Sequence, residues 1–537
     1  MAVAGLVRGW ALGVCFGVLC LGQIHSPGQS APGQVAPGQM RTVSGTVVNS
    51  VTGEPISHAL VQVFGSENAA VFTGADGRFE IPNIPKQPIN ATARKPGYTG
   101  ARHMIPYGPD ENNLTLKLTP DAGIHGRVTS DQGEPVEGIQ VQAFGEQIAG
   151  GRKQERMASI ATTDENGEYD LDSLAPGNYF LRTQQRPLYR MSVALPAAQV
   201  AYPAEFYPDA PDRASAQAVK VLPGQTAEAD FALKLIPTFR VSGAIGGAGN
   251  GGIFVNMSGS DGEETSTPVQ FNPRTGRFTL TAVPAGSWTF TFRARGGNNP
   301  ANFAYAETQL DVKSNLSNVV LALQPVLPIP VNIVHAADSA RGPQPVVQLI
   351  PRGGASLLSR GIYMARPPQA ELQAQSAPPD TLEIRDIPPG RYQVAVRTFA
   401  LNECLDTITS GSTDLMHTDL TVTEGAPPQP ITVSLRNDCA TVDGTVRAEG
   451  VTGLVYVLLV PDSGVGDPVV RPAQPNGMFT FSGIRPDTYH VYAVPEIEDL
   501  EYTNPEALRG LSGQEITVSA NQKAAVTLDL AAAGGSQ

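Results

Sequence analysis

One motif recurs five times along this chain, and its spacing limits the folds that the chain can adopt. Each copy begins with an apolar residue, has an Ile, Leu or Val five residues later, and has an aromatic residue or Ile ten residues after its start. The copies are Phe79–Ile89, Tyr169–Tyr179, Phe278–Trp288, Leu382–Tyr392 and Phe479–Tyr489. They begin 90, 109, 104 and 97 residues apart. The repeating unit therefore has the size of a small domain.

The residues inside each copy predict β-strands. FEI, YDL, FTL, LEI and FTF alternate apolar and polar positions, as in a strand with one buried face. Dipeptides that favour tight hairpins precede four of the copies: Asp76-Gly77, Asn166-Gly167, Thr275-Gly276 and Asn476-Gly477. The fourth copy has Asp380-Thr381 in this place. Roughly six or seven short strands per repeat are typical of a β-sandwich.

The predicted fold is therefore all-β, a tandem array of five sandwich domains. We place them at residues 41–119, 120–237, 238–325, 326–437 and 438–531, followed by a short tail at 532–537. Abundant Gly (56) and Pro (46) among 537 residues agree with short strands and many turns. The net charge of −13 argues against nucleic-acid binding, because an acidic chain repels phosphate backbones.

The N-terminal segment has the pattern of an export signal. Arg8 supplies a positive charge, and an apolar stretch from Trp10 to Leu21 follows it. We predict a signal peptide at 1–22 with cleavage before Gln23. The alternative is lipidation at Cys20, but Leu19 is bulky where a lipoprotein signal has a small residue.

Residues 23–40 repeat SPGQ and APGQ and are predicted to be a disordered linker. No later apolar run approaches the ~20 residues of a spanning helix, so we expect no transmembrane span in the mature chain. The predicted location is outside the cytoplasm: secreted, periplasmic or on the cell surface.

The mature chain would keep two cysteines, Cys404 and Cys439, because Cys15 and Cys20 belong to the predicted signal. In an oxidising compartment a lone pair of cysteines most often forms a disulfide. We therefore predict a Cys404–Cys439 bond near the junction of the fourth and fifth domains.

The opening strands and the motif together resemble the carboxypeptidase regulatory-like family. SGTVVNSVTGEPISHALVQVFG (44–65) parallels HGRVTSDQGEPVEGIQVQAFG (125–145), and the second half of the family pattern is complete at 167–179. The resemblance implies prealbumin-like (transthyretin-like) sandwiches, a fold that is also labelled carbohydrate-binding-like and is related to the Cna B-type repeat. It is closest in the first two repeats and weakest in the fourth.

Some Cna B-type repeats carry a Lys–Asn cross-link. The opening strands of this chain contain no Lys, so we expect no such cross-link. Those strands lie at 42–50, 123–129, 239–245, 330–335 and 440–447.

No set of residues in the sequence predicts catalysis, a metal site or a cofactor. The seven histidines are scattered, at positions 25, 58, 103, 125, 335, 417 and 490. Residues 247–252 match G-x-G-x-x-G, but a strand-like segment follows where a dinucleotide site needs a helix. Residues 164–167 resemble part of a calcium loop but lack its later ligands, so we interpret them as a turn.

Aromatic residues offer one candidate ligand site. Trp288 occupies the repeat position of Tyr179, Tyr392 and Tyr489 and is predicted to be core. Tyr189, Tyr202, Phe206 and Tyr207 form a cluster in an insertion of the second repeat. This insertion is either a ligand-binding loop or a loop that packs over a sandwich edge.

The sequence favours an exported, non-catalytic structural or interaction protein. Its partner would be an envelope or extracellular protein, or a glycan. The alternative function is a module that binds carbohydrate or cell-wall polymer, for which exposed aromatic rings would be the mark.

Overall fold

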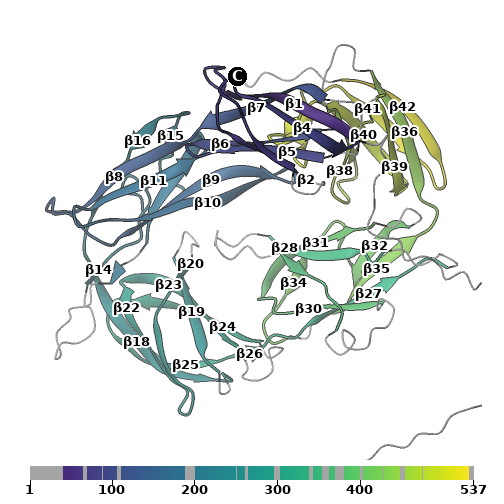
Figure 1. Cartoon of the computed structure of the whole chain (residues 1–537). Helices are drawn as coiled ribbons and strands as arrows, with labels where there is room; N and C mark the ends of the chain where they lie inside the picture. The colour runs from purple at the N-terminus through teal and green to yellow at the C-terminus, as the bar shows by residue number, and fades with distance from the viewer. Residues whose placement is uncertain are drawn as a thin grey trace, which may run out of the picture. The chain divides into compact units, whose positions relative to one another are not determined.

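The computed structural model describes residues 40–64, 69–86, 89–105, 111–184, 186–187, 200–248, 251–259, 264–295, 303–337, 343–352, 362–368, 380–399, 403–426, 429–447, 454–474 and 476–530. In these residues nearly all regular structure is β-strand (Figure 1), and the one helix is α1 (Pro505–Leu508). The all-β prediction is confirmed. The predicted signal peptide, nearly all of the linker and the tail lie outside the described residues.

The strands fall into five consecutive sets, which we number as sandwiches one to five. Sandwich one is a seven-stranded sheet in the order β3-β2-β5-β6-β7-β1-β4. Its strands are β1 (Met40–Asn49), β2 (Leu60–Phe64), β3 (Ala69–Phe72), β4 (Arg78–Pro85), β5 (Ile89–Lys95), β6 (Tyr98–Ile105) and β7 (Glu111–Pro120).

Sandwich two pairs its strands as β10-β9-β12-β15 and β11-β8-β16, with β17 also beside β8. Its strands are β8 (Ala122–Ser130), β9 (Gln140–Ala149), β10 (Arg152–Thr162), β11 (Glu168–Leu174), β12 (Gly177–Thr183), β13 (Arg186–Pro187), β14 (Val200–Tyr202), β15 (Val219–Val221), β16 (Thr226–Glu228) and β17 (Phe231–Leu233).

Sandwich three has the sheet β18-β22-β21, with β25 beside β18, and the sheet β20-β19-β23-β24-β26. Its strands are β18 (Ile236–Gly246), β19 (Ile253–Ser258), β20 (Glu264–Ser266), β21 (Val269–Asn272), β22 (Arg277–Pro284), β23 (Gly286–Arg295), β24 (Phe303–Val312), β25 (Leu316–Ala322) and β26 (Gln324–Pro325). Strands β13 and β14 join its first sheet at the start of β18.

Sandwich four has the sheets β30-β27-β35-β32-β33 and β29-β28-β31-β34. Its strands are β27 (Ile329–Val334), β28 (Val346–Pro351), β29 (Tyr363–Met364), β30 (Thr381–Ile384), β31 (Gly390–Arg397), β32 (Cys404–Ser410), β33 (Thr413–Asp414), β34 (Leu420–Val422) and β35 (Ile431–Arg436).

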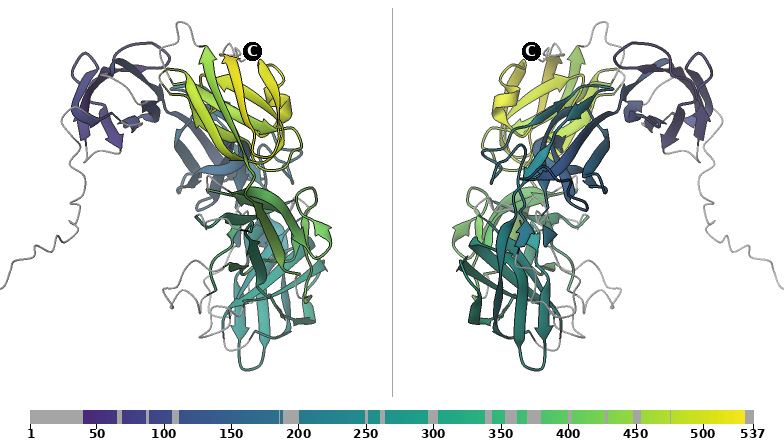
Figure 2. Two further views of the ribbon diagram at one scale, coloured as in Figure 1. Left: turned by 90° about the vertical axis from the view of Figure 1, so that its right-hand side faces the viewer. Right: turned by 90° about the vertical axis from the view of Figure 1, so that its left-hand side faces the viewer.

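Sandwich five, yellow in Figure 2, has the sheets β39-β36-β42 and β38-β37-β40-β41. Its strands are β36 (Ala440–Arg447), β37 (Tyr456–Pro461), β38 (Val469–Pro472), β39 (Met478–Ile484), β40 (Asp487–Val494), β41 (Gly513–Val518) and β42 (Lys523–Asp529). The exact domain boundaries stay predictions.

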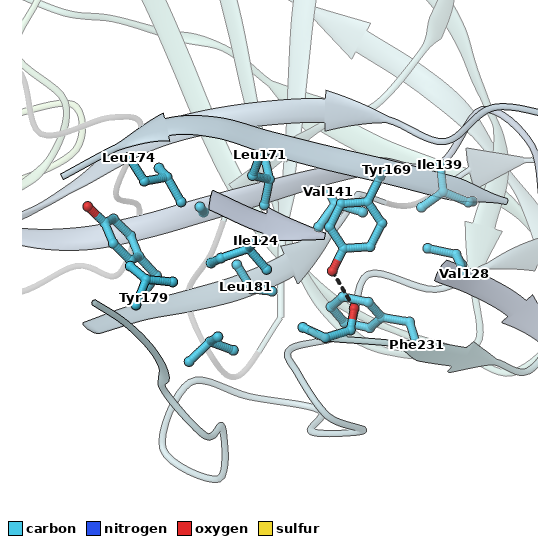
Figure 3. Close-up of a cluster of buried hydrophobic side chains, with 14 of the residues drawn as sticks. Ile124, Val128, Ile139, Val141, Tyr169, Leu171, Leu174, Tyr179, Leu181 and Phe231 are labelled. Atoms are coloured by element: carbon cyan, nitrogen blue, oxygen red, sulfur yellow. Dashed lines mark hydrogen bonds between the residues drawn. The ribbon is translucent and has the colours of Figure 1, made fainter. Parts of the chain in front are cut away.

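Each sandwich buries a hydrophobic core drawn from its own strands. The five clusters lie within residues 43–118, 122–233, 241–323, 329–435 and 440–528. Figure 3 shows the core of sandwich two, in which the Tyr169 hydroxyl donates a hydrogen bond to the Ala229 carbonyl. Since apolar burial is the dominant stabilising term, each set of strands carries its own driving force for folding.

In every sandwich the first strand pairs in parallel with the last strand of three or more residues, which we call its last strand; in sandwich three this is β25, because β26 has only two residues. The pairs are β1 with β7, β8 with β16 and β17, β18 with β25, β27 with β35, and β36 with β42. Because paired parallel strands run in one direction, the chain enters a sandwich at one end and leaves at the opposite end.

A glycine lets the two parallel strands approach closely in four of the five sandwiches. The glycines are Gly45, Gly126, Gly243 and Gly444. A Cβ atom at Gly243 would lie 1.8 Å from the carbonyl oxygen of Val319, far inside van der Waals contact. In sandwich four Val331, which pairs with the first motif residue Leu382, stands at this place, and the pairing of β27 with β35 runs without a shift of register.

The fifth residue of each motif copy has a left-handed backbone. The residues are Asn83, Ser173, Ala282, Asp386 and Gly483, with φ from 58° to 69°. Strand pairing shifts register at this point in sandwiches two, three and five, which is the geometry of a β-bulge.

The bulge explains the spacing of the motif. In a regular strand the first and third motif residues would face the core and the sixth would face away. One extra residue in the left-handed conformation reverses this alternation. Consequently the sixth residue is buried in every copy: Ile84, Leu174, Val283, Ile387 and Ile484.

The eleventh residue of the motif ties the turn to the strand that follows it. In four copies its ring donates a hydrogen bond to the carbonyl oxygen four residues earlier. The pairs are Tyr179 to Ala175, Trp288 to Pro284, Tyr392 to Pro388 and Tyr489 to Arg485. The ring of Trp288 packs against the core of sandwich three, which confirms its predicted core role.

The close approach at Gly243 predicts a strong effect of a single methyl group. We expect Gly243→Ala to destabilise sandwich three by about 3 kcal/mol or more, because the new Cβ meets backbone that cannot rotate away. Gly252→Ala is the matched control, since a Cβ there meets nothing within 4 Å. Urea unfolding followed by Trp288 fluorescence measures both variants, and equal stability of the two would contradict the account.

Candidate functional site

The predicted ligand loop of sandwich two is an edge segment that packs against its own domain. We call residues 200–217 the strap. The Thr183 amide donates to the Glu205 carbonyl and the Tyr207 amide donates to the Leu181 carbonyl, so the strap continues the sheet beside β12. A tight turn closes it, with reciprocal backbone hydrogen bonds between Phe206 and Ala210.

The described rings of this loop do not form an exposed platform. Tyr202 is 8% exposed and Phe206 only 1%. Tyr207 is half-buried, and its ring meets the edge of Phe231 in the core at 5.8 Å between ring centres. Tyr189 lies outside the described residues. Of the two alternatives that the sequence allowed, the described rings therefore have the packed arrangement. Binding of a ligand by this loop stays a prediction.

Arginine side chains fasten the strap over the outer side of the sheet. The guanidinium of Arg213 lies over the Phe180 ring and pairs with Glu155 on β10 at 2.9 Å. The buried guanidinium of Arg182 lies 5.7 Å from the centre of the Phe206 ring. These cation–ring contacts and the ion pair make the strap a structural cover.

One carboxyl group of the strap has a strongly perturbed pKa. Burial raises the pKa of Glu205 to about 7, and the negative charge of Asp209 adds to the shift. The packed strap therefore favours the protonated acid at this position.

The predicted disulfide is present between Cys404 and Cys439. Its Cα atoms are 5.9 Å apart, and it joins the start of β32 to the residue directly before β36. Cys404 is buried. The bond therefore ties sandwich four to the segment that leads into sandwich five.

A histidine–carboxylate pair lies next to this disulfide and was missed by the sequence analysis. Nδ1 of His335 is 3.0 Å from Glu403, whose side chain is 1% exposed, and Nε2 is 3.8 Å from Asp380. The pairing joins residues 68 positions apart, and no local pattern signals it. His335 directly follows β27 and Glu403 directly precedes β32. The pair therefore fits a structural role, in which it holds the end of β27 beside the start of β32.

The partly buried His490 lies 3.8 Å from Asp462 and from Glu515. Two further histidines bond carboxylates on the surface. His125 bonds Asp170 at 2.8 Å, and this hydrogen bond raises the pKa of His125. His417 bonds Asp414 at 2.8 Å. The residues that the structure describes contain no group of three or more His, Cys, Asp or Glu side chains placed to hold a metal ion.

Of the two short motifs in the sequence, residues 164–167 form a turn. Asp164 accepts hydrogen bonds from the amides of Asn166 and Glu168, the latter being the larger cause of its lowered pKa. The glycine-rich motif lies partly outside the described residues, at 249–250. Strand β19 begins at Ile253, directly after it, where a dinucleotide site needs a helix.

The first part of the chain matches the model of a known domain family. Residues 42–119 and 123–234 match the model of the carboxypeptidase regulatory-like domain. Sandwiches one and two are carboxypeptidase regulatory-like domains. No curated protein matches the sequence.

Solved structures with distant similarity include bacterial pilins. The minor pilin GBS52 of Streptococcus agalactiae is 12% identical, with 37% of this chain and 97% of that chain covered and a TM-score of 0.22. The major pilin subunit BcpA of Bacillus cereus is 11% identical, with 76% and 99% covered and a TM-score of 0.14.

The Bacillus anthracis TIE protein is 12% identical, with 53% of this chain covered and a TM-score of 0.17. The chain spans about half, 51%, of that protein. Similarity at this level carries no argument about function. Separately, no helix among the described residues is long and apolar enough to cross a membrane.

The raised pKa of Glu205 predicts pH-dependent packing of the strap in the second regulatory-like domain. The folded pKa of about 7 exceeds the ordinary value of 4.5. The stability that this group contributes is therefore complete below 4.5 and is lost as the pH rises through about 7. We expect NMR titration of the Glu205 carboxyl group to give a pKa near 7, and Glu205→Gln to remove the pH dependence.

Asp209→Asn provides the matched control. It should lower the pKa of Glu205 only in part, since burial is the larger cause. A Glu205 that titrates near its ordinary value would contradict the packed strap.

Proposed function

We propose that this protein is an exported, non-catalytic structural and interaction protein built of β-sandwich modules. The observation that carries the proposal is the parallel pairing of first and last strands in all five sandwiches. A module of this topology carries the chain from one end to the other, as a spacer requires. A strand such as β1, with 10 residues, spans about 30 Å at ~3.3 Å per residue.

The hydrogen bonds that the buried tyrosine hydroxyls make support a non-catalytic role. The hydroxyls of Tyr169, Tyr179 and Tyr489 donate to backbone carbonyls and hold turns and strands in place. Each core is apolar and belongs to one module. The match of residues 42–119 and 123–234 to the regulatory-like domain likewise supports a module that is repeated for its fold.

Two features support a location outside the cytoplasm. The N-terminal sequence places Arg8 before an apolar stretch, as in an export signal. The Cys404–Cys439 bond fits an oxidising compartment. We propose that the protein is secreted, periplasmic or surface-exposed, where an envelope or extracellular partner would meet the loops between strands.

Export and oxidation give a joint prediction. We expect the native protein outside the cytoplasm, beginning at Gln23, with no free thiol until a reductant is added. Reduction should lower the stability of sandwich four by about 4 kcal/mol, the chain-entropy value for a loop of 35 residues. Cell fractionation, N-terminal sequencing and thiol labelling test this. Cytoplasmic protein with free Cys404 and Cys439 would contradict the proposal.

A further inference from the structure

Sandwich three presents one sheet face built from short polar side chains beside an exposed ring. The sheet contains β19, β23 and β24 side by side. On β19 the inward residues Ile253, Val255 and Met257 belong to the core. Their neighbours Phe254 and Asn256 therefore point outward, because side chains alternate along a strand.

Strand register places the outward residues in rows. Asn256 pairs with Thr291, which pairs with Glu307. The next row is Ser258, Thr289 and Gln309. Phe254 lies two positions before Asn256 on the same side of the sheet, and its row continues through Arg293 to Tyr305. We call the set Phe254, Asn256, Thr289, Arg293, Glu307 and Gln309 the open face.

The Phe254 ring and the Glu307 carboxylate of the open face are exposed to solvent. Phe254 is 67% exposed, among the highest values for a large apolar side chain in the described residues. Glu307 and Gln309 are exposed, while Asn256 and Thr289 are half-buried. Exposing a phenyl ring to water is unfavourable, and an apolar ring beside a few placed polar groups is the combination that ligand sites use.

The carboxylate of the open face is held in place by a neighbour on its own strand. The Tyr305 hydroxyl donates a hydrogen bond to Glu307 Oε2, and Tyr305 itself is buried. Thr291, between Asn256 and Glu307 in the row, is also buried. A carboxylate fixed in this way loses little conformational freedom when it binds a partner.

Two other sandwiches cover the corresponding side of their sheets with their own chain. The strap does so in sandwich two through Arg213 and Phe180. In sandwich five an apolar cluster includes Tyr456 and Tyr492 on the sheet and Leu508 on α1, with Leu511 packed against it. Nothing of this kind lies over Phe254 in the described part of sandwich three, as its exposure shows.

We propose that the open face binds a neutral oligosaccharide. A sugar ring has an apolar C–H face that can stack on Phe254, as ligand sites pair apolar contact with a few placed polar groups. Its hydroxyls both donate and accept hydrogen bonds. Glu307 supplies acceptors, while the amides of Asn256 and Gln309 supply donors and acceptors.

Charge favours a neutral sugar over an acidic one. The chain carries a net charge of −13, and the open face contains one carboxylate, Glu307, and one guanidinium, Arg293, so its own charge is balanced. An anionic polymer would be repelled by the net charge of the chain and would gain no net attraction from a balanced face. This proposal adds a ligand to the scaffold role and does not depend on export, so the two can fail independently.

The test is an array of neutral gluco-, manno-, galacto-, xylo- and chito-oligosaccharides probed with the full chain from Gln23, followed by calorimetry on the best ligand. We expect Phe254→Ala and Glu307→Gln each to weaken binding by about tenfold or more. Val320→Ala is the matched control. Val320 is 79% exposed on β25, in the opposite sheet of the same sandwich, and its replacement should leave the affinity unchanged.

Folding of each variant is checked by the emission of Trp288, the only tryptophan in a chain that begins at Gln23. Glu307→Gln keeps a hydrogen-bond acceptor for the Tyr305 hydroxyl, so this substitution should leave the fold intact. Absence of binding to every sugar on the array would overturn the proposal. So would a bound sugar whose affinity is the same in Phe254→Ala, Glu307→Gln and Val320→Ala.

Discussion

The pairing of the first strand with the last closes each sandwich, and the other features of the repeat serve that contact. The two strands run parallel, and a glycine in the first strand lets the backbones approach in four of the five sandwiches. At Gly126 the partner atom is the Ala229 carbonyl oxygen, which also accepts the hydrogen bond of Tyr169. One local contact therefore joins the opening strand, the motif and the closing strand.

The motif could be predicted from sequence because its chemistry is local. Alternation in Phe79–Ile81 and Tyr169–Leu171 gives one buried face, and both segments are strands with that pattern. The left-handed position was not predicted, because Asn83, Ser173 and Ala282 share no side-chain chemistry. The clue was the odd spacing between the first and sixth motif residues, which a regular strand cannot bury on one side.

Contacts between distant segments could not be predicted in the same way. His335 and Glu403 meet only because the fold brings the end of β27 to the start of β32. The second apolar cluster of sandwich five did have a signal. Residues 454–460 read Leu-Val-Tyr-Val-Leu-Leu-Val without alternation, and such a run indicates a strand buried on both faces.

We infer that each sandwich is a self-sufficient folding unit, because each has its own core. The most direct measurement is to produce residues 440–530 alone and follow their urea unfolding by circular dichroism. This segment contains β36–β42, α1 and both apolar clusters of sandwich five, apart from Met104 of sandwich one, which packs against the second cluster. The account predicts a β-rich spectrum and a single cooperative transition. A segment that stays unfolded in the absence of the other four sandwiches would contradict it.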